Sequence, residues 1–150
     1  MNLKENIFEF ILKRQGARQV KMPVWKNVHS IAILHQHANI QHIIKELSKD
    51  GKKVVAYDMP DKKDICWLSD RPKGKVRDMI TTNQYDLLID LTQQPSLTMQ
   101  YMALYIKAGF KTGRHLRDGI HDLTIETAAQ DKPDYLFEQI MRYIEMFGGK

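Results

Sequence analysis

The sequence is short of cysteine and of long apolar runs. Its 150 residues include one cysteine, Cys66, so no disulfide can form within the chain, and a reducing compartment is expected. No apolar stretch approaches the roughly 20 residues that a membrane span requires. Glu9 interrupts the N-terminal apolar run of residues 7–12, and Lys13 and Arg14 follow it where an export signal would need small residues. We therefore expect a cytoplasmic protein without a transmembrane segment.

Several motifs that mark catalytic or cofactor sites are also missing. The chain contains neither G-x-G-x-x-G nor G-x-x-x-x-G-K-[ST], which bind phosphates, and neither G-x-S-x-G nor H-E-x-x-H, which mark serine nucleophiles and zinc. His35, His37 and His42 lie close together in sequence, but no carboxylate or cysteine at matching spacing completes a set of metal ligands. The sequence therefore predicts no cofactor and no metal, and it gives nucleophilic catalysis no support.

Positive charge exceeds negative charge. The formal net charge of +5 and the pI near 9.3 suit a nucleic acid, an anionic lipid or a phosphorylated ligand, but equally a solubilising surface. One segment concentrates this charge, because no acidic residue separates Lys107, Lys111, Arg114 and Arg117. The segment could bind phosphate or form an edge strand protected by lysines. Phe110 is its only aromatic residue, so bases lack a stacking platform, and nucleic acid is not the expected partner.

Apolar periodicity predicts alternating helices and strands. Helical spacing marks residues 3–15, a helix from a cap at Asn39 to Gly51, a short helix after Gly74, residues 96–108, and a last helix from Asp131 or Pro133. Short apolar runs predict strands at residues 30–34, 53–57, 65–68, 86–91, 110–113 and 123–126. Such alternation is typical of βαβ units.

The predicted fold class is α/β: a three-layer Rossmann-like sandwich with a mainly parallel sheet of five or six strands and mixed-direction edge strands. Only about seven residues separate the strands at 53–57 and 65–68, whereas a parallel crossover needs a dozen or more, so these two strands would pair antiparallel or not be neighbours. No linker or repeat divides the chain. We expect one α/β domain over residues 1–150, with an N-terminal helix at 1–16 and a connector at 17–28.

Polar residues follow three of the predicted strands, at the carboxyl ends where ligands bind in open α/β sheets. The predicted ligand-binding set combines these loops with the basic segment: His35, His37, Asn39, Asp58, Asp90, Thr92, Gln93, Lys111 and Arg114. Asp90 lies inside an apolar run, and Asp90 and His37 are the candidate acid–base groups. Structural alternatives exist, because aspartate favours turns, Asn39 can cap a helix, and histidines also occur as plain surface groups.

Residues 84–113 resemble part of a known family. They contain QYDLLIDLT at 84–92 and AGFKTG at 108–113, separated by a predicted helix. This stretch is similar to the "YDLVIDLQG" strand and "AGAKRRIG" turn of heptosyltransferase-type GT-B glycosyltransferases, which implies a Rossmann-like half-fold. Residues 35–39 depart from the glycine–aspartate turn of those enzymes, and their donor-binding domain has no counterpart in these 150 residues. Sugar transfer is therefore not implied. As a whole, the chain also resembles a small family of the Bacteroidetes without an assigned function.

The predicted function is the binding of a small anionic ligand or a protein partner at the carboxyl edge of the sheet, without catalysis. One alternative is an enzyme acting on a phosphorylated or glycosyl substrate. Another is a peripheral membrane or scaffold protein, because the first helix ends in Lys13 and Arg14, as an interfacial helix would. Glu5 and Glu9 favour a helix packed on the core instead. No pattern indicates an oligomeric state.

Overall fold

A five-stranded sheet forms the centre of the protein in a computed structural model that describes residues 2–16, 18, 20–114, 117–128 and 131–148. The strand order is β2-β1-β3-β4-β5. The strands are β1 (Ser30–His35), β2 (Lys53–Asp58), β3 (Gln84–Asp90), β4 (Lys107–Arg114) and β5 (Leu123–Ile125). All four neighbouring pairs run parallel. The predicted α/β class is confirmed, but the edge strands β2 and β5 run with the others, so the predicted mixed directions were wrong.

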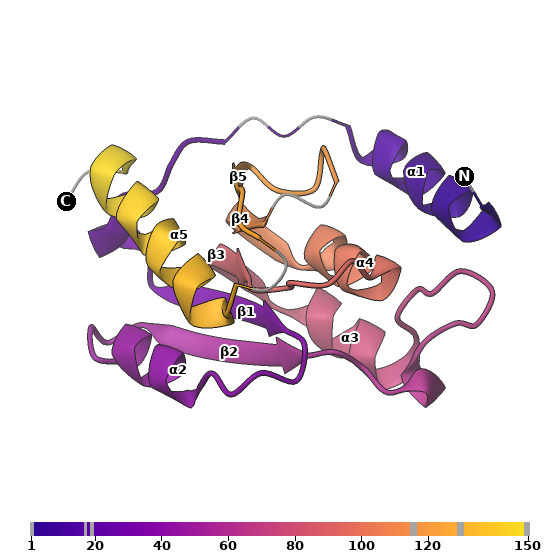
Figure 1. Ribbon diagram of the computed structural model, residues 1–150, viewed down its shortest axis with the longest axis horizontal. Coiled ribbons are helices and arrows are strands. Elements are labelled where there is room, and N and C mark those ends of the chain that lie inside the picture. The colour runs from indigo at the N-terminus through magenta and orange to yellow at the C-terminus, as the bar shows by residue number, and fades with distance from the viewer. Residues whose placement is uncertain (1, 17, 19, 115–116, 129–130, 149–150) are drawn as a thin grey trace.

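Helices cover both faces of the sheet and complete three layers (Figure 1). They are α1 (Leu3–Gln15), α2 (Gln41–Ser48), α3 (Gly74–Thr82), α4 (Leu97–Tyr105) and α5 (Pro133–Phe147), with short 3₁₀ turns η1 (Trp25–Asn27) and η2 (Lys62–Asp64). One core cluster joins α2 and α5 to the sheet, and another joins α1, α3 and α4 to its other face. The central residues of β1 and β3 are buried between these clusters, which explains their continuous apolar runs.

Residues 65–68 form a turn and not the predicted strand. Ile65 makes a single antiparallel bridge with Pro72, and Asp70 between them takes a left-handed conformation with φ of 66°. Cys66 lies partly buried in this turn, while Trp67 and Leu68 are exposed. An apolar run forms a strand where neighbouring strands pair with it and bury it. Among the described residues, residues 65–68 have no such neighbours and fold into a local turn instead.

The boundary between α4 and β4 differs from the prediction. The helix ends at Tyr105 and not at residue 108, and β4 begins at Lys107, which pairs with Gln84 of β3. Gly109 therefore lies inside a strand instead of ending a helix. Pairing with β3 overrides the helical propensity of these residues and lengthens the strand expected at 110–113.

The start of α2 also differs from the prediction. Ile40 and not Asn39 occupies the position before the first helical residue. The side-chain oxygen of Asn39 accepts a hydrogen bond from the backbone N–H of Gln41 at 3.3 Å. Asn39 therefore stabilises the turn before the helix without being its N-cap.

The connection from β4 to β5 passes over the face that carries α1 and α4. Only eight residues separate the two parallel strands. This short crossover suffices because β5 pairs only with the last residues of β4, from Thr112 to Arg114, so the chain returns a short distance. Ile120 of the connection is buried in the same cluster as Phe8 of α1.

One face of α1 packs on the core through α4, as the acidic residues of this helix suggested. Phe8 is fully buried and meets the ring of Tyr101 edge-on, with ring centroids 4.7 Å apart. Phe10 lies on the opposite side of the helix and is 61% exposed. The two phenylalanines thus separate the packed face of α1 from its outer face.

Truncating these two phenylalanines should have opposite consequences. Phe8→Ala should lower the free energy of unfolding by about 3–5 kcal/mol, because it removes a fully buried ring and leaves a cavity. Phe10→Ala should change it by no more than about 0.5 kcal/mol, because the ring is already exposed. Urea denaturation of the two variants and the wild type measures both values. Equal losses would contradict the docking of α1 through Phe8.

Candidate functional site

The carboxyl ends of β1 and β2 meet at Asp58. Its carboxylate accepts hydrogen bonds from the backbone N–H of His37 at 2.6 Å and of Met59 at 2.7 Å, and it lies 3.1 Å from Nδ1 of His37. Burial alone would raise the pKa of Asp58, but these hydrogen bonds outweigh it and lower that pKa below its usual value. His35 lies beside them, and its burial lowers its pKa. The structure thus brings His35, His37 and Asp58 together, with Asp58 anchoring the turn.

The loops that follow β1 and β3 are tied to each other. Oε1 of Gln36 accepts hydrogen bonds from the backbone N–H groups of Gln93 and Gln94, at 3.0 and 2.9 Å, and its Nε2 donates to the carbonyl of Gln94 at 3.1 Å. Arg114 donates to the carbonyls of Gln93 and Thr127. The strand order reverses between β1 and β3, which is where ligands usually bind in such sheets. In this protein, the polar groups of the two loops form hydrogen bonds with one another.

The basic segment folds inward and does not form an open phosphate bed. Lys111 is 3% exposed, and its ammonium donates to the carbonyls of Ala103 and Leu104 at the end of α4, at 2.8 and 3.0 Å. Burial, and secondarily the charge of Arg18, lowers the pKa of Lys111 to about 8. Arg117 donates to Gln100 at 2.8 Å and pairs with Glu9. These groups hold the helices to the sheet. His115 of the same segment lies outside the described residues.

Asp90 forms a buried pair with His121. Nε2 of the imidazole lies 2.8 Å from Oδ2 of the carboxylate, and both side chains are at most 4% exposed. The other oxygen, Oδ1, accepts the backbone N–H of Thr92 at 3.0 Å. An ionised carboxylate only accepts, so Nε2 of His121 carries the shared hydrogen. Among the described residues, nothing hydrogen-bonds to Nδ1 of this buried ring. Asp90 therefore pairs with His121, whereas the predicted partner His37 pairs with Asp58.

The Asp90–His121 pair can form because position 113 is a glycine. Gly113 lies beside Asp90 in the register of β3 and β4. A Cβ atom at Gly113 would come within 2.8 Å of the Asp90 carbonyl oxygen and within 3.0 Å of Nε2 of His121. Either distance is far below van der Waals contact. The imidazole of His121 therefore lies over Gly113, in the space that a side chain at this position would fill.

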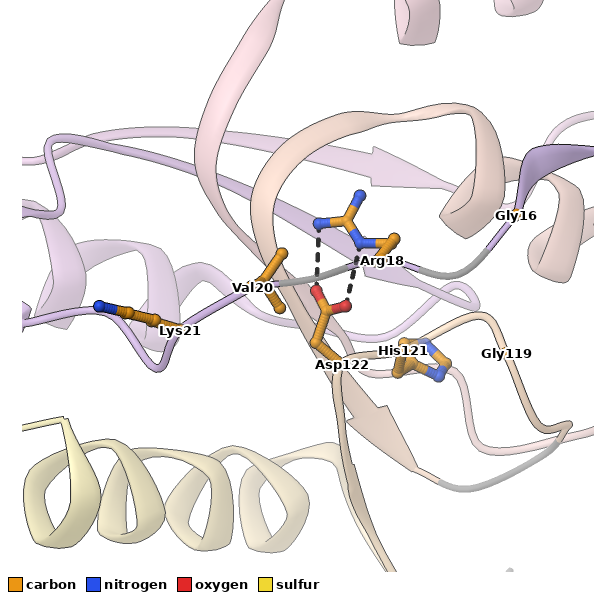
Figure 2. Close-up of a pocket in the computed structure, with 7 residues that line it drawn as sticks. All are labelled: Gly16, Arg18, Val20, Lys21, Gly119, His121 and Asp122. Atoms are coloured by element: carbon orange, nitrogen blue, oxygen red, sulfur yellow. Dashed lines mark hydrogen bonds and ion pairs between the residues drawn. The ribbon is translucent and has the colours of Figure 1, made fainter.

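A hollow of about 770 Å³ lies beside this pair. It is lined by Gly16, Arg18, Val20, Lys21, Gly119, His121 and Asp122. The guanidinium of Arg18 donates to both carboxylate oxygens of Asp122, at 2.9 and 3.1 Å, and to the Ala108 carbonyl at 2.8 Å. Figure 2 shows Arg18 and Asp122 facing each other, His121 beside Asp122, and Lys21 pointing away from them. The connector after α1 thus forms one wall, and the segment before β5 forms the other.

Sequence patterns alone did not single out His121. The pair joins residues 31 positions apart, and it depends on the short crossover that carries His121 back over β4. The only sequence signals were an aspartate inside an apolar run and a glycine at residue 113. No group of three or more His, Cys, Asp or Glu able to hold a metal occurs in the described parts of the chain. Within the same residues, no helix is long and apolar enough to cross a membrane.

Fold and site together define a parallel α/β domain with a buried aspartate–histidine pair at the edge of a hollow. The chain belongs to a protein family of unknown function, DUF6913, whose model matches residues 26–147. No curated protein and no solved structure showed significant similarity to the chain. The likeness of residues 84–113 to GT-B glycosyltransferases therefore stays an interpretation of the sequence.

Adding a methyl group at residue 113 should disrupt the site. Gly113→Ala should lower the free energy of unfolding by about 3 kcal/mol, because the new Cβ overlaps both the β3 backbone and the imidazole. Gly109→Ala in the same strand is the matched control: its Cβ would lie 3.2 Å from one carbonyl oxygen, and about 1 kcal/mol is expected. Chemical denaturation compares the two variants. A smaller loss at Gly113 than at Gly109 would contradict the described packing.

Burial of Lys111 should make stability depend on pH. With its pKa lowered to about 8, the lysine of the folded state loses its proton before that of the unfolded state. The unfolded state then binds more protons, and the free energy of unfolding should rise by roughly 1–2 kcal/mol from pH 7.5 to pH 9.5. Lys111→Met should abolish this rise, while Lys107→Met, at an exposed position, should keep it. Urea denaturation across this range measures the slope, and a flat wild-type curve would be inconsistent with a buried ammonium.

Proposed function

We propose that this domain binds a small anionic ligand in the hollow beside His121. The observation that carries the proposal is Nδ1 of His121, a buried polar atom with no hydrogen-bond partner among the described residues, on a residue that lines the hollow. A buried polar atom without a partner costs free energy, and a bound ligand, ion or water molecule would remove that cost. Asp90 bonds to the opposite ring nitrogen, Nε2, and so fixes the orientation of the imidazole.

The charges around the hollow favour an anion over a cation. The Arg18 side chain is one-third exposed, and its pairing with Asp122 cancels the one carboxylate on the wall. An N–H group at Nδ1 of His121 would add a hydrogen-bond donor, and Lys21 is among the lining residues. At the predicted site, by contrast, the Asp58 carboxylate lies at the centre of the loops and would repel an anion. Of the residues predicted from sequence, we therefore retain Asp90, as the group that orients His121.

The second candidate function is an enzyme acting on a phosphorylated or glycosyl substrate. The same pair supports it, because a histidine held by a carboxylate on one ring nitrogen can exchange a proton through the other. His121 would then be the acid–base group, with Asp90 positioning it, in place of the predicted His37. A ligand that binds and is recovered unchanged favours the first function, whereas its conversion favours the second.

Thermal unfolding in the presence of candidate ligands tests the proposal. Inorganic phosphate, sugar phosphates, nucleotides and nucleotide sugars are added in turn to the full chain. A ligand present at 100 times its Kd should raise Tm by roughly 5–10 °C. Failure of all these anions to raise Tm at millimolar concentration would contradict anion binding.

Replacement of His121 by glutamine locates the site. The glutamine amide can still donate to Asp90 from a position near Nε2, but it provides no atom at Nδ1. His121→Gln should therefore fold and lose the ligand-induced rise in Tm. His42→Gln is the control, because His42 is an exposed histidine that pairs with Asp134 at 2.8 Å. A rise that is equal in both variants would place the ligand elsewhere.

A further inference from the structure

The turn between η2 and α3 is held in one conformation by hydrogen bonds. The backbone N–H of Cys66 donates to the Arg71 carbonyl at 2.8 Å, and that of Asp70 donates to the Cys66 carbonyl at 2.7 Å. Lys4 of α1 pairs with the Asp70 carboxylate at 2.9 Å, and Thr98 of α4 donates to the Asp70 carbonyl at 2.8 Å. The backbone of the turn is therefore anchored to two helices, and it holds residues 67 and 68 at the surface.

This anchored turn presents apolar side chains to solvent. Trp67 is 81% exposed, and Leu68 beside it is about half exposed. Leu3 at the start of α1 lines a common hollow with both of them. Phe10 lies two turns further along the same outer face of α1 and is also exposed. Figure 1 shows α1 and this turn together at one end of the molecule. We call these four residues (Leu3, Phe10, Trp67 and Leu68) the apolar end.

The two segments that carry the apolar end also carry exposed positive charge. Residues 3–15 and 61–75 carry eight basic and five acidic side chains, a net charge of +3 of the formal +5 of the chain. The excess of positive charge is larger among the exposed side chains. Asp61 is the only exposed acidic residue of these two segments, whereas six basic residues are exposed. The six are Lys13, Arg14, Lys62, Lys63, Lys73 and Lys75. A surface that complements this end is therefore apolar and negatively charged.

We propose that the apolar end docks on an anionic lipid bilayer. Trp67, Leu68 and Leu3 enter the boundary between head groups and acyl chains, where tryptophan is favoured because its ring is apolar and its N–H polar. The exposed lysines and arginines bind the anionic head groups, each adding attraction that falls off within a Debye length. The opposite face of α1 stays packed through Phe8, so docking needs no unfolding of this helix.

The charge pattern favours a membrane over a protein partner. The exposed basic residues lie on α1, on η2, just before α3 and in its first turn, so they come from the same two segments as the apolar end and are spread over several elements. A fluid anionic surface can neutralise such dispersed charges without shape complementarity, whereas a protein would need acidic groups placed opposite each lysine. This inference is independent of the proposed ligand site, which uses Arg18 and His121.

Co-sedimentation of the full chain with vesicles tests the proposal. The wild type should bind vesicles of phosphatidylcholine mixed with phosphatidylserine, bind phosphatidylcholine alone much less, and dissociate at high salt. Trp67→Ala should weaken binding to the mixed vesicles roughly tenfold, because it removes the largest inserted side chain. Phe147→Ala is the matched control, since Phe147 is an exposed aromatic residue of α5 and lies outside the apolar end. Both variants should keep the wild-type Tm.

Fluorescence provides a second readout that does not depend on a loss of function. Trp25→Phe leaves Trp67 as the only tryptophan. Its emission should shift to shorter wavelength when phosphatidylserine vesicles are added, as an exposed indole enters an apolar layer. The proposal is overturned if the emission does not move, if binding ignores phosphatidylserine, or if Trp67→Ala and Phe147→Ala bind alike. An acidic protein surface would then be the partner to seek.

Discussion

The close pairing of β3 with β4 is the constraint on which the candidate site depends. It sets Gly113 beside Asp90, and the absent side chain at Gly113 leaves room for one imidazole. His121 fills that room, and its hydrogen bond to Asp90 fixes the crossover that leads into β5. Arg117 in the same crossover reaches Gln100 and Glu9, so α4 and α1 are secured by the segment that carries the histidine. A change in this register would remove the pair and both attachments together.

Polar residues at the carboxyl edge of the sheet act mainly as ties between loops. Asp58 collects backbone N–H groups from two loops, and the Gln36 amide joins the loops at which the strand order reverses. Lys111 bonds to the carbonyls at the end of α4. Buried or bonded in this way, these groups meet the general requirement that polar atoms removed from water find partners. The polar groups at the place where such folds usually bind ligands are therefore largely bonded to one another, whereas the hollow beside His121 stays open.

His121 and Trp67 both depart from what folding alone would favour. A buried ring nitrogen of His121 has no hydrogen-bond partner among the described residues. Trp67 is exposed to solvent on a turn whose backbone is held by hydrogen bonds. Both cost free energy in the isolated chain, the first through an unmet hydrogen bond and the second through hydration of a large apolar ring. Departures of this kind are expected at functional positions, because a ligand or partner relieves them. DUF6913 is a family of unknown function, so the roles of His121 and Trp67 have to be established by experiment.

The α/β class, the strands β1 and β3 and the helix α1 could be predicted from the sequence. A strand buried on both faces is a continuous apolar run, and a helix buried on one face has apolar residues at helical spacing, so both patterns can be read locally. Asp90 became a candidate for the same reason, as a carboxylate inside an apolar run. Tertiary structure decided the rest. Pairing with β3 turned the expected end of α4 into a strand, and residues 65–68 became a turn. The partner of Asp90 was decided by contacts between distant segments, which leave no period or motif in the chain.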